Sequence, residues 1–118
     1  MLILSKRPDN SVEQLKQPQW LFEAPLHYFA GEIMRILDIE DEAEIAVSIK
    51  RAFQACMVMN IPLNRHFKRV YCFDGTSLIA DWKISALAFY LIVVNCNPGN
   101  ERVAKAQLYF AMHNAENI

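Results

Sequence analysis

The stretch that decides the fold runs from residue 70 to residue 94 and reads VYCFDGTSLIADWKISALAFYLIVV. Its first part has apolar and aromatic residues on both sides of the dipeptide Asp74-Gly75. Because Asp-Gly supplies the positive φ that tight hairpin turns require, we expect a β-hairpin with short strands near 70–73 and 77–80.

The second part of this stretch predicts a helix over residues 82–94. Asp81 can cap its first turn, and the residues that follow are apolar on almost every side. A helix that is apolar all round lies in the centre of a fold, so we expect this helix to be the most buried one.

Two further helices are predicted on the N-terminal side. Pro25 suits the first position of a helix over residues 25–37, in which apolar residues recur at three- and four-residue spacing. Asp41 can cap a helix over residues 41–59, with Glu44 reaching back in a capping box.

A fourth helix is predicted on the C-terminal side, near residues 98–113. Either Asn97 or Asn100 can cap it. If Gln107 on this helix is buried, its amide needs hydrogen-bond partners, and we expect these to be backbone groups of the loop at residues 95–100.

These elements predict a small single domain, mainly α in the α+β class, with about four helices and one β-hairpin. A chain of 118 residues is ordinary for one domain, which we place at residues 25–118. Residues 1–24 are expected to form an extended tail that packs on the domain, since Trp20, Leu21 and Phe22 are too apolar to remain in water.

The net charge is too small to attract the protein to DNA or to an anionic membrane as a whole. Twelve Lys and Arg stand against 13 Asp and Glu, for a net charge of −1, so DNA would have to meet a local patch. The longest strongly apolar run, residues 84–94, is well short of the roughly 20 residues that span a bilayer. Residues 1–4 are too few for a signal peptide, so a cytoplasmic protein without a membrane partner is expected.

No pattern of reactive residues points to an enzyme. The cysteines are odd in number and widely spaced, which favours reduced thiols over a disulfide framework: Cys56, Cys72 and Cys96. The histidines lack the short spacing of metal ligands: His27, His66 and His113. We therefore expect no catalytic residues, no metal and no cofactor.

Charge is nevertheless segregated along the chain. Five carboxylates lie between residues 38 and 44, whereas residues 45–73 contain no acid. The acid-free stretch carries the candidate DNA-binding residues Lys50, Arg51, Arg65, Lys68 and Arg69. If these five cations converge near the hairpin, they can hold phosphates. The alternative is that they complement the macrodipole of helix 41–59 and face water.

The segment from Asp81 to Asn95, continued by Gln107, Tyr109 and Phe110, resembles the DNA-damage-inducible protein D family. More distantly, it is similar to the BRO N-terminal domains of viral and phage proteins. Residues 29–37 resemble the family's first helix, and the resemblance covers about residues 28–113.

Three departures from the family pattern stand out. Gly31 replaces a basic residue, Asp38 replaces the glycine that closes the first helix, and Cys96-Asn97 replaces a glycine-aspartate pair. Any role of the loop that contains this pair is therefore open in the present chain.

The resemblance implies a non-enzymatic regulator or accessory factor of bacterial or mobile-element DNA metabolism, within the DNA-damage response. Two hypotheses follow. The protein contacts DNA through its five cations, or it is a protein-interaction module that binds a recombinase, a repressor or its own copy. A homodimer is expected, because Trp20 to Phe22, the central helix and Tyr109 supply more apolar area than one small domain encloses.

Overall fold

The computed structural model describes residues 24–116. In chain order the elements are β1 (Tyr28–Phe29), α2 (Ala30–Ile36), α3 (Glu42–Val58), the 3-10 turn η3 (Leu63–Arg65), β2 (Phe67–Phe73), β3 (Leu78–Ile84), α4 (Ala86–Val94) and α5 (Glu101–Glu116). The predicted α+β class with four principal helices is confirmed for this part of the chain. The tail predicted at residues 1–24 lies, apart from Ala24, outside the described residues.

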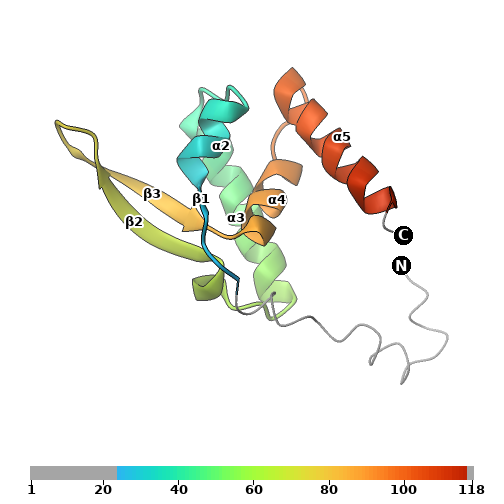
Figure 1. Ribbon diagram of the computed structural model, residues 1–118, viewed down its shortest axis with the longest axis horizontal. Coiled ribbons are helices and arrows are strands. Elements are labelled where there is room, and N and C mark those ends of the chain that lie inside the picture. The colour runs from blue at the N-terminus through green and yellow to red at the C-terminus, as the bar shows by residue number, and fades with distance from the viewer. Residues whose placement is uncertain (1–23, 117–118) are drawn as a thin grey trace.

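The sheet has three antiparallel strands in the order β1-β3-β2. The hairpin turns where predicted, with Gly75 at φ +100°, but its strands are longer than expected and reach back to Phe67 and forward to Ile84. Figure 1 shows the β2–β3 hairpin projecting away from the helices, which pack together beside its base.

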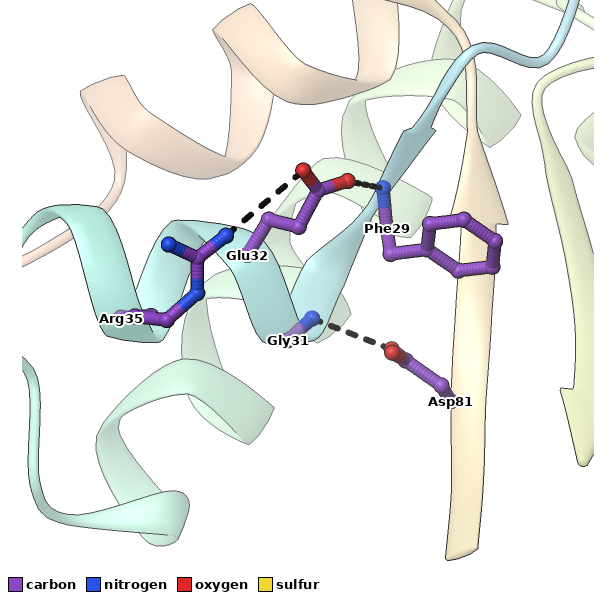
Figure 2. Close-up of polar contacts among 5 residues, drawn as sticks. All are labelled: Phe29, Gly31, Glu32, Arg35 and Asp81. Carbon is purple, nitrogen blue, oxygen red and sulfur yellow. Dashed lines mark hydrogen bonds and ion pairs between the residues drawn. The ribbon is translucent and has the colours of Figure 1, made fainter. Parts of the chain in front are cut away.

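The prediction of a helix from residue 25 is wrong at its start. Tyr28 and Phe29 are extended and pair with Ile84 and Lys83 of β3, so α2 begins only at Ala30. The free edge of β3 offers backbone hydrogen bonds to these two residues, and this adds a third strand to the expected hairpin. The Glu32 carboxylate then accepts the Phe29 N–H at 3.0 Å, as Figure 2 shows.

The prediction that Asp81 caps the central helix is also wrong. Asp81 belongs to β3, and α4 is capped by Ser85, whose hydroxyl accepts the Ala88 N–H at 3.2 Å. Asp81 instead accepts the Gly31 N–H at 3.1 Å in the first turn of α2 (Figure 2). Its carboxylate therefore caps a helix that precedes it in the sequence.

The remaining helix starts agree more closely with the sequence. Asp41 caps α3 through the Ala43 N–H at 2.9 Å, as predicted, although the Glu44 carboxylate accepts the Asn97 N–H at 3.2 Å in place of closing a capping box. Of the two asparagines considered for the fourth helix, Asn100 is the cap.

The core lies where α4 meets α2, α3, α5 and β3. Ile92 and Val93 of α4 are fully buried, as are Ile33 of α2 and Val103 of α5. The central position expected for this helix is therefore confirmed.

The predicted partners of Gln107 are found in part. Its amide donates to the carbonyls of Val93 and Cys96, both at 3.0 Å, and only Cys96 belongs to the loop named above. Ser48 of α3 donates to the carbonyl of Asn95 at 3.1 Å. The loop at residues 95–100 thus joins α3 to α5.

Candidate interaction surface

The two cations on α3 lie on different sides of that helix. Lys50 lines a cleft that it shares with Arg69 of β2. Arg51, about 100° further round the helix, borders a separate hollow beside Asn97 and Pro98. Helix geometry therefore separates Lys50 from Arg51.

The two cations on β2 are separated in the same manner by the strand. Successive residues of a strand point to opposite faces, so Lys68 and Arg69 cannot lie on one side of the sheet. The Arg69 guanidinium lies 4.8 Å from the centroid of the Trp82 ring on the face that packs against α3. Lys68 is on the other face, directly opposite Lys83 of β3.

Arg65, the fifth candidate, is exposed in η3, at the start of the loop into β2. The five predicted cations thus do not share one face, although Lys50 and Arg69 line a common cleft. Sequence reasoning missed Lys83, which only the pairing register brings beside Lys68.

Within the part of the chain that the structure describes, none of these cations forms an ion pair. Among residues 24–116 the ion pairs are Glu32–Arg35 at 3.9 Å and Glu101–Lys105 at 3.6 Å, both within a single helix. Of the candidate cations, Arg69 lies against the Trp82 ring, and none has an ion pair within the described part of the chain.

The outer part of the hairpin, residues 70–80, is the most unusual surface of the molecule, and we call it the arm. Every residue from Tyr71 to Ala80 is exposed. Tyr71, Phe73 and Leu78 keep 67%, 69% and 68% of their surface accessible. Exposed apolar side chains gathered in this way mark interaction surfaces more often than scattered single ones do.

The tip of the arm is ordered by its own aspartate. The Asp74 carboxylate accepts hydrogen bonds from the N–H groups of Thr76 and Ser77, and from the Thr76 hydroxyl, all at 2.9 Å. The hydrogen bonds from the Ser77 and Thr76 backbone hold the pKa of Asp74 below its ordinary value. The tip therefore carries a negative charge at neutral pH.

A cleft of about 600 Å³ lies between the base of the arm and the helices. Its apolar wall is formed by Met34 of α2 and by Ile45, Ile49 and Phe53 of α3. The opposite wall belongs to β3 and includes Trp82, whose ring meets that of Phe53 edge-on at 5.4 Å.

The contact between Gly31 and Asp81 holds these two walls together (Figure 2). A Cβ atom at position 31 would stand only 2.9 Å from the Asp81 carboxylate, so glycine leaves room for this carboxylate at the first turn of α2.

His66, Ser85, Cys56 and Cys96 are enclosed within the fold, whereas Cys72 is exposed. The His66 Nδ1 lies 2.6 Å from the Ser85 hydroxyl, but both residues are fully buried, out of reach of a substrate. Burial raises the pKa of the Cys56 and Cys96 thiols. Within residues 24–116, no three His, Cys, Asp or Glu side chains gather into a possible metal site, and no helix is long and apolar enough to cross a membrane.

In comparisons with known proteins, no family model, no curated protein and no solved structure matches the chain.

Proposed function

We propose that this chain is a non-enzymatic accessory factor of DNA metabolism that acts in the cytoplasm as a protein-interaction module. The resemblance of residues 28–113 to the DNA-damage-inducible protein D family supports the setting. The exposed arm supports the mode of action.

The observation that carries the proposal is the apolar character of the arm. Three large apolar side chains remain about two-thirds exposed on a projecting hairpin. Unpaired bases can stack on Tyr71 and Phe73. Residues 70–80, however, contain no Lys or Arg to hold the phosphates of a nucleic acid, and they carry the acid Asp74. A protein surface can remove all three side chains from water, at about 25 cal/mol per Å². A protein is therefore the better partner for this element.

DNA contact is the second candidate, and one observation favours it. Lys68 and Lys83 lie directly opposite one another across two strands, an arrangement of like charges that costs stability. An anion on this face would offset the repulsion. Arg65 lies two residues before β2 and could add a third positive charge to such a contact. Such a contact would involve only part of the predicted set.

The experiment compares bare single-stranded DNA with the same DNA coated by a bacterial recombinase. We expect the full-length protein to bind the coated strand, and we expect a Tyr71→Ser, Phe73→Ser variant to lose that binding. A matched variant, Leu108→Ser with Met112→Ser, changes exposed apolar residues on α5 and should bind as the wild type does.

Retardation of bare DNA at about 50 mM salt would overturn the proposal in favour of DNA contact. Binding should then weaken as salt rises, with a log-log slope near −2 for about three phosphate contacts on a single strand. Replacement of Arg65, Lys68 and Lys83 by alanine would flatten that slope, whereas Arg51→Ala would change it little.

A further inference from the structure

The arm and the cleft lie on the same face of the hairpin. Residues two apart on a strand share a face, so Tyr71 and Phe73 lie on the side of Arg69. Leu78, opposite Phe73 in the register, lies on the side of Trp82. Because Arg69 and Trp82 line the cleft, this face carries a cleft at its base and exposed apolar side chains at its tip.

We propose that a second copy of this chain fills the cleft with its arm, and that the two copies exchange arms about a twofold axis. This inference rests on the proposed function and names the partner of the arm in the free protein; binding to the coated strand then requires the two copies to separate. When two hairpins stack face to face in opposite directions, the tip of each lies over the base of the other. A twofold contact then fills both clefts with the same pair of surfaces.

The acidic tip of the arm can meet the two cations that line the cleft, which also holds two carboxylates. Residues 70–80 contain no Lys or Arg, and their one charged group is the Asp74 carboxylate at the tip. The cleft presents Lys50 and Arg69, neither of which has an ion-pair partner within the described part of the chain. Glu42 and Asp81 also line it, but the Asp81 carboxylate already accepts the N–H groups of Gly31 and Trp82.

The available area matches a modest but specific dimer. An aromatic side chain buries about 150–250 Å² when fully enclosed. Two arms, each with Tyr71, Phe73 and Leu78 about two-thirds exposed, laid against an equal area of cleft wall, bury on the order of 1,000 Å² or more. This is the lower range of specific protein interfaces. The cleft, at about 600 Å³, is large enough for several side chains.

Disulfide trapping between two proteins, each with one new exposed cysteine, tests the geometry. Both carry Cys72→Ser, which removes the exposed native thiol. One adds Leu78→Cys at the tip, and the other adds Ala46→Cys, an exposed position on the α3 wall of the cleft. On mixing and mild oxidation we expect a mixed disulfide dimer. The control pair, Ala46→Cys with Leu108→Cys on α5, should form at least tenfold less.

Light scattering after size exclusion, over about 1–100 µM full-length protein, tests the energetics. We expect a dimer whose Kd rises at least about 100-fold in the Phe73→Ser, Leu78→Ser variant, since two large apolar side chains leave the interface. Lys50→Glu should raise the Kd about tenfold. Arg51→Glu, its neighbour outside the cleft, should change the Kd less than twofold. Circular dichroism checks that each variant is folded.

The outcomes separate this inference from the proposed function. A monomer mass over the whole concentration range, or a dimer that gives no tip-to-cleft disulfide, overturns the arm exchange. If such a protein still binds the coated strand through Tyr71 and Phe73, the proposed function stands and the arm has a different protein as its partner. If the dimer forms as described but bare DNA is retarded, only the proposed function fails.

Discussion

The arm and α4 are both apolar in sequence, yet α4 contributes to the buried core and the arm is exposed. In α4, Ile92 and Val93 are fully buried because helices and a strand surround them. In the arm, Phe73 and Leu78 remain exposed because the hairpin extends past the helices that cover its base. Apolar composition by itself therefore does not decide burial. For the arm, burial depends on how far β2 and β3 extend past the helices that cover their base.

The largest expected effect comes from truncating one residue in each region. Ile92→Ala should lower the free energy of unfolding by about 3–4 kcal/mol, through lost burial and the cavity left behind. Phe73→Ala should change it by less than about 0.5 kcal/mol in the monomer. Urea denaturation below 1 µM protein, followed by circular dichroism, measures both. Equal effects would contradict the contrast between α4 and the arm.

The reaction rates of the three cysteines provide a second comparison between the arm and the buried core. Cys72 of the arm is exposed, whereas Cys56 and Cys96 are buried, and burial raises the pKa of both buried thiols. At pH 8 we expect a thiol reagent to modify Cys72 at least about 100-fold faster than the other two, because the thiolate is the reactive form. Three thiols reacting at one rate would show that the core around Cys56 and Cys96 opens to the reagent as readily as the arm does.

A substitution at Asn100 should lower the stability of the helical part of the domain without changing any residue of the arm. Its amide oxygen accepts the Arg102 N–H at 2.8 Å at the start of α5, and its amide nitrogen donates to the Leu37 carbonyl at 2.9 Å. Asn100→Ala should cost about 1–3 kcal/mol of stability, since a helix cap and a second hydrogen bond are lost together. Asn97→Ala, which removes only a contact to the Gly99 N–H, should cost less than about 1 kcal/mol. A thermal or urea unfolding curve decides whether the two losses differ.

The smallest expected effect is a gain in stability from a substitution at the end of α2. Asp38 follows α2 with φ 55°, in the left-handed region that favours glycine. Asp38→Gly should raise the free energy of unfolding by about 0.5–1 kcal/mol by relieving this conformation. Asp38→Ala should not raise it, because alanine is strained at the same φ. A lower melting temperature for the glycine variant would show that the Asp38 side chain contributes more than its backbone costs.

The sequence predicted elements that depend on local signals. Asp41 before α3 and Asp74-Gly75 in the hairpin act within a few residues of themselves, and both were placed correctly. Asp81 carries the same local signal as a helix cap, but its carboxylate serves a helix earlier in the chain. No window of residues around position 81 contains that information.

The candidate site was less accessible to prediction for the same reason. Whether Lys50 and Arg69 share a cleft depends on the rotation of α3 and on the register of β2, neither of which is encoded near either residue. The two residues of β1 are too few to show the alternation that marks a strand. The apolar residues of the arm were predicted as strands, but their exposure depends on where the helices end.

The contact between Gly31 and Asp81 also sets an order of events during synthesis. The two residues are 50 positions apart, so at about 5–20 residues per second roughly 3 to 10 s separate their emergence from the ribosome. The β2–β3 hairpin, whose turn is local, closes within about 1–10 µs of becoming available. β1 and the first turn of α2 therefore cannot dock until β3 has been translated. Their docking then joins residues near the start of the described chain to residues 50 or more positions later.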